Sequence, residues 1–149
     1  MALATRDANV TWSGTLASGD GELRTGALSG ALPMEWAKRT EQAEGTTSPE
    51  ELLAAAHASC YAMTLALLLS REGHEPERLD VHGTCELDKT GGTPEYAITG
   101  LRLEVEGVVP GIDGEAFEAL ARRANEECAI TAALQGARAE VVLQATLAA

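Results

Sequence analysis

Two of the three cysteines stand where their thiols could carry out successive steps of one reaction. Cys60 lies within SPEELLAAAHASCYAMTLALLL, residues 48–69, where a thiol is either a small core hydrophobe or a nucleophile beside an apolar wall. The middle of a helix is beyond the reach of the N-terminal dipole, so a reactive Cys60 needs a cation from another element. Cys128 ends a second expected helix, where we expect the negative end of the dipole to raise its pKa. This asymmetry suits an attacking thiolate and a second thiol that acts later.

His57 and Cys85 carry weaker signals. His57 precedes Cys60 by three residues and therefore shares its helix face. His57, Cys60 and Cys128 could together ligate a metal, but the chain has neither a CxxC pair nor a second paired histidine. His57 could also act as a general base, although a histidine satisfied within the core is commoner. Cys85 falls in the middle of an expected strand, and we interpret it as a core residue.

The composition indicates a globular chain and excludes several classes of partner. Of the 149 residues, 45% are hydrophobic and only 3% are aromatic, so the core must be built from Ala, Leu, Val and Ile. Such small side chains bury less area each, and association of two copies can make up the deficit. The net charge of −12 argues against nucleic acid and anionic membrane surfaces as partners, because both require a basic face.

The expected compartment is the cytoplasm. The N-terminal sequence MALATRDANV lacks the charged region and apolar core of a signal peptide. An odd number of cysteines does not make a disulfide framework. In a reducing compartment, a cysteine pair is more often catalytic than structural.

The hydrophobic pattern predicts an α+β fold in a single domain over residues 1–149. Strands are expected within residues 8–36, where NVTWSGTL and ELRTGALSG form a hairpin around the turn signal SGDG. A central helix is expected over 49–72, with strands and a second helix over 79–149. This last region begins with two strands joined by the loop KTGGTPE, continues with a helix capped near Asp113, and ends with the strand ARAEVVLQATL. The order of elements indicates largely antiparallel pairing.

The central helix has the clearest boundaries in the chain. Ser48 is the expected N-cap, Pro49 occupies the first helical position, and Glu51 completes a capping box with Ser48. The helix should end near Gly73. It is long enough to span a membrane, but it is rich in Ala and has no aromatic belt. We therefore interpret it as a helix buried on all sides, and we expect a homodimer because one short chain can hardly bury it alone.

The segment EGTTSPEELLAAAHASCYAMTLALLL resembles the motif of the OsmC/Ohr family of cysteine-dependent peroxidases, which reads approximately G-T-N-P-E-E-L and then A-A-H-A-A-C-F. The early VTWSG, the later VPGID and the distal NEEC also match the family pattern, in the right order and at the right spacing. The resemblance spans nearly the whole chain. It implies antiparallel sheets around a long buried central helix in an intertwined homodimer.

The resemblance also implies an activity. A protein of this family is a thiol peroxidase that reduces organic hydroperoxides, and hydrogen peroxide more weakly, to serve defence against oxidative and osmotic stress. Cys60 matches the peroxidatic cysteine, which becomes a sulfenic acid, and Cys128 matches the resolving cysteine, which forms a Cys60–Cys128 disulfide. A dithiol, such as a lipoyl group on a partner protein, then restores both thiols. No metal or organic cofactor is needed. Here Ala129 stands where the family usually has the proline of a Pro-Val-Ser sequence.

Two further residues acquire expected roles from the resemblance. Glu50 matches the active-site glutamate of the family, and Arg39 in KRTE matches the arginine that holds the thiolate and the peroxide in the OsmC branch. The Ohr branch carries its arginine in an N-terminal turn, which here reads SGDG and has none. Glu50 should orient Arg39 through paired hydrogen bonds.

The spacing of Glu50 and Cys60 has a geometric consequence. The two residues are ten apart on one expected helix, which corresponds to about 15 Å along its axis. A single arginine would struggle to serve both within one chain, so we expect Glu50 to reach the Cys60 of a partner subunit. Two other interpretations remain open, namely a non-catalytic thiol redox sensor and a metal-binding dimer module.

Overall fold

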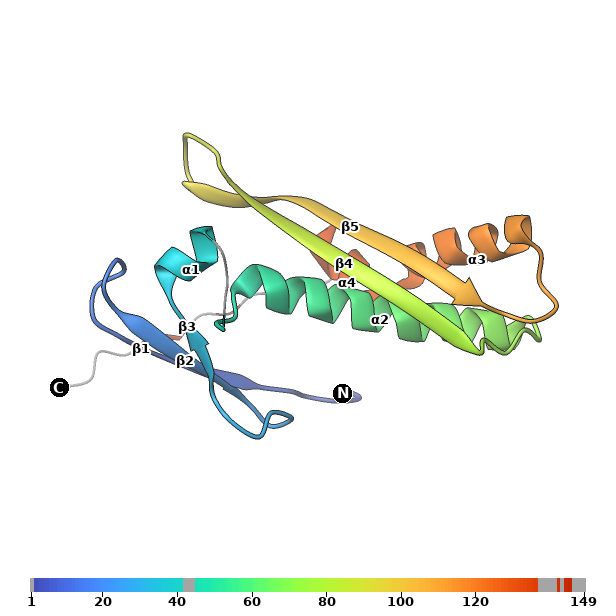
Figure 1. Ribbon diagram of the computed structural model, residues 1–149, viewed down its shortest axis with the longest axis horizontal. Coiled ribbons are helices and arrows are strands. Elements are labelled where there is room, and N and C mark those ends of the chain that lie inside the picture. Colours follow the sequence, from blue (N-terminus) through green and yellow to red (C-terminus); the bar gives the residue numbers. More distant parts are fainter. Residues whose placement is uncertain (1, 42–44, 137–141, 143, 146–149) are drawn as a thin grey trace. The chain divides into compact units, whose positions relative to one another are not determined.

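The computed structural model describes residues 2–41, 45–136, 142 and 144–145. Its elements, shown in Figure 1, are β1 Ala8–Ser13, β2 Asp20–Thr25, β3 Leu32–Met34, α1 Trp36–Thr40, α2 Pro49–Arg71, β4 Arg78–Lys89, β5 Tyr96–Val108, α3 Gly114–Glu127 and α4 Ala129–Leu134. The predicted α+β class, with antiparallel sheets and a long central helix, is confirmed. The predicted closing strand falls mostly on residues outside those described.

The chain divides into two compact units. The first contains residues up to 53 together with 85–100, and the second contains 54–84 together with the residues from 101 onward. The expectation of a single domain over the whole chain stays a prediction.

The first unit carries a three-stranded antiparallel sheet in the order β1-β2-β3. Val10 stands opposite Leu23 in the first pair of strands, and Leu23 stands opposite Leu32 in the second. This pairing confirms the predicted N-terminal hairpin. The sequence pattern did not predict the short helix α1 that follows β3, because five residues are too few to show a helical period.

The second sheet is the hairpin of β4 and β5. The Thr90 N–H donates to the Glu95 carbonyl at 2.9 Å beside the tip, and the Glu77 N–H donates to the Val108 carbonyl at 2.8 Å beside the base. Gly83 allows β4 to approach α2 closely, since a Cβ at this position would lie 2.7 Å from the carbonyl oxygen of Ala54. This close approach explains why a glycine occupies an otherwise apolar position in the strand.

The N-terminus of α2 has the predicted cap. The Glu51 N–H donates to Ser48 Oγ at 3.1 Å, while the Glu51 carboxylate accepts from the Thr47 hydroxyl at 2.8 Å. In the predicted capping box the Glu51 carboxylate would accept from the Ser48 N–H. The structure instead gives it the Thr47 hydroxyl as donor. At the other end, Gly73 adopts a φ of +83° and the His74 N–H donates back into the helix, which ends it within one residue of the predicted boundary.

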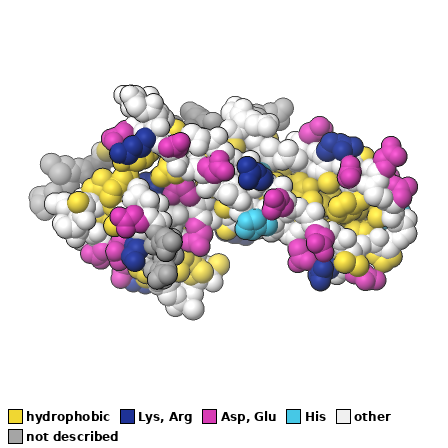
Figure 2. All heavy atoms as spheres, turned by 45° about the horizontal axis from the view of Figure 1, so that its top comes forward, with side chains coloured by type: hydrophobic (Ala, Val, Ile, Leu, Met, Phe, Trp, Pro, Cys, Tyr) yellow, Lys and Arg dark blue, Asp and Glu magenta, His cyan; other side chains and the backbone are white. Residues whose placement is uncertain are grey.

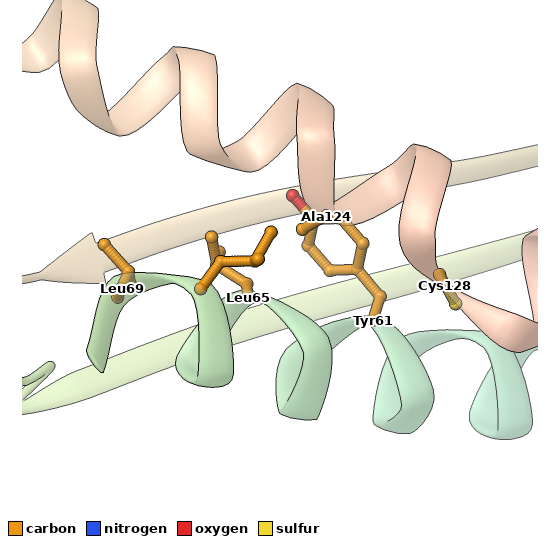
Figure 3. Packing of buried hydrophobic residues seen from close by; sticks show 6 residues of the cluster. Tyr61, Leu65, Leu69, Ala124 and Cys128 are labelled. Carbon is orange, nitrogen blue, oxygen red and sulfur yellow. The ribbon is translucent and has the colours of Figure 1, made fainter. Parts of the chain in front are cut away.

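The α3 helix begins where the sequence predicts, because Asp113 Oδ1 accepts from the Ala116 N–H at 2.9 Å. A break at Cys128 separates it from the six-residue helix α4, which the pattern did not predict. The core of the second unit lies between α2, α3 and the β4–β5 hairpin. Figure 3 shows this packing, and its buried members are Tyr61, Leu65, Leu68, Leu69, Ala124 and Cys128.

One side of α2 carries exposed apolar side chains in the second unit. Met63 is 69% exposed and Leu67 is 49% exposed, although they alternate along the helix with fully buried leucines. By length and composition alone α2 could cross a membrane, a weak signal that a core helix also gives. Asp and Glu side chains are spread over the face shown in Figure 2, with hydrophobic side chains exposed between them. The predicted homodimer, which would cover such apolar surface, stays a prediction.

Candidate active site

The structure brings the two predicted cysteines of the site together within the second unit. Cys60 is half-buried on α2, and Cys128 is fully buried at the junction of α3 and α4. The two thiols lie close enough for a hydrogen bond from Cys60 to lower the pKa of Cys128. Both are free, so the described pair is in the reduced state. The predicted Cys60–Cys128 disulfide stays a prediction.

The expected effect of the helix dipole on Cys128 was wrong. Burial of Cys128 raises its pKa and is the largest single effect, but the backbone and side chain of Thr131, the Cys60 thiol and the Ile130 backbone together outweigh it. The pKa of Cys128 therefore lies below its ordinary value. The cause is the unpredicted helix α4. Cys128 is its N-cap and makes no ordinary capping hydrogen bond, but the backbone N–H groups of Ile130 and Thr131 lower its pKa.

A polar network adjoins Cys128 inside this unit. His57 Nε2 and Thr131 Oγ1 lie 2.8 Å apart, and Thr131 Oγ1 donates to Asn125 Oδ1 at 3.2 Å. His57 and Thr131 are both buried. Burial lowers the pKa of His57, so the imidazole stays neutral at physiological pH. Its other nitrogen, Nδ1, is buried and has no hydrogen-bond partner among the described residues.

Tyr61 points from α2 toward α3 and lies next to Cys128 (Figure 3). Its hydroxyl donates to the Ala121 carbonyl at 3.0 Å, which fixes the ring against α3. Burial raises the pKa of Tyr61, and the nearby charge of Cys128 raises it further. Tyr61 therefore remains a neutral phenol and supplies an apolar ring surface beside the thiol pair.

The first unit contains the other two predicted site residues, and they are paired. Arg39 Nη2 donates to Glu50 Oε1 at 2.7 Å, and Arg39 Nε lies 3.2 Å from both carboxylate oxygens. Glu50 is buried, with only 8% of its surface exposed. Burial raises the pKa of Glu50, but the hydrogen bonds and charge of Arg39, together with hydrogen bonds from its own backbone N–H and from Ser48, outweigh this effect, so its pKa lies below the ordinary value. The carboxylate is therefore charged and holds the guanidinium plane in one orientation.

Aromatic side chains support Arg39 from the other side. The guanidinium carbon lies 5.5 Å from the centre of the Trp36 ring, within the range of a cation–π contact. Tyr96 meets the Trp36 ring edge to face, with the two ring centres 5.2 Å apart. The sequence offered no signal for this role of Trp36, because its ring contacts a strand distant in sequence.

An apolar pocket of about 210 Å³ opens beside Arg39 in the same unit. Its walls come from the β-sheet, from α1 and from the start of α2. The residues that line it are Trp12, Leu16, Met34, Glu35, Trp36, Arg39, Thr47 and Pro49. A guanidinium at the edge of an apolar cavity suits a ligand with a polar oxygen at one end and a hydrocarbon tail.

Cys85 lies in the strand β4, as the sequence predicted. It is only half-buried, whereas a core residue was expected. Burial raises the pKa of Cys85, and the negative charges of Glu50 and Glu86 raise it further. A thiol with a raised pKa is a poor nucleophile at neutral pH. Within the described residues, no group of three or more His, Cys, Asp or Glu side chains is arranged to hold a metal ion.

Comparison with known proteins gives consistent matches over most of the chain. The model of a family described as OsmC-like protein matches residues 41–143. The chain is 36% identical over 135 residues to peroxiredoxin OsmC of Escherichia coli strain K12, which covers 89% of each chain.

Solved structures resemble this fold at similar coverage. The organic hydroperoxide resistance protein OhrB of Bacillus subtilis superposes with a TM-score of 0.68 at 25% identity, over 91% of this chain and 93% of that one. An OsmC-like protein of unknown function from Vibrio cholerae gives a TM-score of 0.69 at 17% identity, over 88% of this chain and 94% of that one. The second likeness concerns the fold alone.

Proposed function

Because this chain belongs to the OsmC-like protein family, we propose that it is a thiol-dependent peroxidase that reduces organic hydroperoxides to alcohols. The observation that carries the proposal is the close pair of Cys60 and Cys128 in the core of the second unit. The names of two similar proteins, a peroxiredoxin and an organic hydroperoxide resistance protein, support the same activity.

In the first step, the Cys60 thiolate attacks the terminal oxygen of the hydroperoxide. A sulfur–oxygen bond forms, the O–O bond breaks, and the alkoxide leaves with a proton as the alcohol. Cys60 is thereby oxidised to a sulfenic acid. Arg39 would stabilise the thiolate and donate to the departing oxygen as negative charge builds on it. The Arg39–Glu50 pair supports this role, since a guanidinium held in one plane loses little freedom on binding the peroxide.

In the second step, the Cys128 thiolate attacks the sulfur of the sulfenic acid. A Cys60–Cys128 disulfide forms, hydroxide leaves, and the proton lost by Cys128 converts it to water. The lowered pKa of Cys128 supports this role, because a larger share of the attacking thiol is then ionised. A dithiol, such as a lipoyl group on a partner protein, would reduce the disulfide and complete the cycle.

The preference for an organic peroxide follows from the apolar surroundings. A hydrocarbon tail gains about 25 cal/mol for each Å² removed from water, whereas hydrogen peroxide has no tail to bury. The apolar pocket beside Arg39 supports this preference.

We further propose that the working form is a homodimer in which Arg39 and Glu50 of one chain serve the partner subunit's Cys60. Exposed apolar side chains on α2, among them Met63 and Leu67, offer surface for such an assembly. The separation of Glu50 and Cys60 by ten positions along α2 favours this crossed arrangement. With free thiols and no metal or organic cofactor required, the reducing cytoplasm is the compartment that suits this chemistry.

The deciding experiment measures cumene hydroperoxide consumption with excess dihydrolipoamide for the wild type, Cys60→Ser, Cys128→Ser and the control Cys85→Ser. We expect no consumption with Cys60→Ser, a single turnover with Cys128→Ser, and sustained turnover with Cys85→Ser. A wild type that forms the disulfide but stops after a single turnover would instead indicate a redox sensor, and the peroxidase proposal would be abandoned.

A further inference from the structure

The network beside Cys128 contains one hydroxyl whose single hydrogen has two candidate acceptors. Thr131 Oγ1 lies 2.8 Å from His57 Nε2 and 3.2 Å from Asn125 Oδ1, and the Thr131 side chain is near enough to Cys128 to lower the pKa of that thiol. A threonine hydroxyl has one hydrogen to donate and two lone pairs to accept with. The hydrogen therefore goes to either Asn125 or Cys128 when His57 is the donor.

The hydrogen-bond pattern favours His57 as that donor. When the Thr131 hydroxyl donates to Asn125 Oδ1, its oxygen can only accept from His57, so the imidazole proton lies on Nε2. This tautomer leaves Nδ1 as a bare acceptor, in agreement with its buried position without a partner. The alternative tautomer would bury an unpaired N–H group, which proteins avoid more strongly than an unpaired acceptor.

Cys128 is the natural second acceptor for the Thr131 hydrogen. Cys128 is the N-cap of α4 and Thr131 is its third residue, the spacing at which a cap side chain and the first turn of a helix meet. A thiolate accepts a hydrogen bond far more strongly than the neutral amide oxygen of Asn125 does. Formation of the thiolate should therefore draw the hydrogen away from Asn125.

We propose that Thr131 is a two-position hydroxyl switch for the resolving step, which donates to Asn125 while Cys128 is a thiol and turns to the sulfur when Cys128 becomes a thiolate. His57 donates to the Thr131 oxygen in both states and polarises the hydroxyl toward the sulfur. Thr131, His57 and Asn125 are positioning residues, because they act on the reaction through Cys128. The role of this switch in turnover depends on the proposed function, whereas its effect on Cys128 does not.

Other groups also act on this thiol. Cys60 on α2 lies close enough for a hydrogen bond to Cys128, and the charge of Cys128 reaches Tyr61. The charged side chains of α3 that line the same cavity as His57 are Glu118, Arg122 and Glu126. Cys60 is replaced by serine in every protein of the titration below, and the other groups stay unchanged, so differences among the variants report on the Thr131 hydroxyl and its acceptor.

The test titrates Cys128 in a Cys60→Ser/Cys85→Ser background, where it is the only thiol, by the ultraviolet absorbance of the thiolate. We expect Thr131→Val to raise the Cys128 pKa by about one unit. Thr131→Ser should keep the value of the background, since it restores the hydroxyl. Asn125→Ala, at an exposed position that tolerates change, removes the competing acceptor and should lower the pKa. A Cys128 pKa that is equal in the Thr131→Val and background proteins, or unmoved by Asn125→Ala, would overturn the switch.

A second measurement links the switch to turnover. In the otherwise wild-type chain, Thr131→Val should reduce the thiolate fraction of Cys128 about tenfold. Each remaining thiolate is more basic and should therefore react about threefold faster. Disulfide formation after one equivalent of peroxide should therefore slow about threefold, while oxidation of Cys60 keeps its rate. An unchanged rate of disulfide formation would contradict the role in turnover. A wild type without peroxidase activity would instead reject the proposed function and leave the titration to decide the switch.

Discussion

Arg39 and Glu50 form a two-pronged ion pair, with Arg39 Nη2 2.7 Å from one carboxylate oxygen and Nε 3.2 Å from both. Glu50 occupies the first turn of α2, where the positive end of the helix dipole already favours a carboxylate. The start of α2 therefore stabilises the charged carboxylate to which Arg39 binds. In Arg39 the remaining nitrogen, Nη1, is the group through which the guanidinium could address a thiolate or a peroxide oxygen.

Replacement of Arg39 should reduce the catalytic efficiency with organic hydroperoxides. We expect Arg39→Met to lower kcat/KM by about 10²-fold, the usual cost of one donor that stabilises developing charge. Arg39→Lys should recover only part of this loss, because an ammonium cannot reproduce the planar contact with Glu50. The matched control is Arg24→Lys, an exposed arginine paired with Glu22. Equal efficiencies of the wild-type and Arg39→Met proteins in steady-state assays would remove Arg39 from the mechanism.

Mixed dimers test whether the site is shared between chains. Glu50→Ala and Cys60→Ser proteins should each be nearly inactive alone. After the two are unfolded and refolded together, about half of the dimers are mixed, and each mixed dimer would contain one complete crossed site out of two. We therefore expect about one quarter of the wild-type rate. The control refolds Cys60→Ser with itself. If the mixture stays as inactive as its components, Glu50 does not serve the partner subunit's thiol.

Charged substitutions on the exposed side of α2 should weaken the dimer. Met63→Lys and Leu67→Lys replace exposed apolar side chains, so they should leave the free energy of unfolding of an isolated chain nearly unchanged. In a dimer that covers this surface, each would bury a charge, and we expect dissociation at micromolar concentration in sedimentation velocity. Leu28→Lys, at an exposed leucine outside α2, is the matched control. Dimers of unchanged stability would place the interface elsewhere.

The sequence predicted the elements whose signals are local. Ser48 and Asp113 were found as helix caps because a cap is a matter of residue type and short spacing. Gly73 likewise marked the end of α2, since few other residues adopt its positive φ without strain.

Prediction failed where short elements or tertiary contacts decide. The helix α4 is too short to show a period, so the direction in which the Cys128 pKa is shifted was predicted wrongly. A search for a helix cap at Cys128, with Thr131 three residues later, could have found the start of α4. His57 was considered alone as a ligand, base or core residue, because its partner Thr131 lies 74 residues away in the chain. Trp36 had no signal at all, since its contact with Tyr96 exists only in the folded chain.

The buried His57 should make the stability of the fold depend on pH. Burial lowers the pKa of His57 in the folded chain below its ordinary value of 6.5. Between these two values the unfolded chain binds more protons than the folded one, so the free energy of unfolding should fall as the pH drops below about 6.5. His57→Gln keeps a side-chain N–H donor for Thr131 but cannot be protonated, and it should remove this part of the pH dependence. The exposed His82→Gln is the matched control. Urea unfolding at several pH values measures the effect, and a slope equally steep in His57→Gln and wild-type proteins would show that another group is responsible.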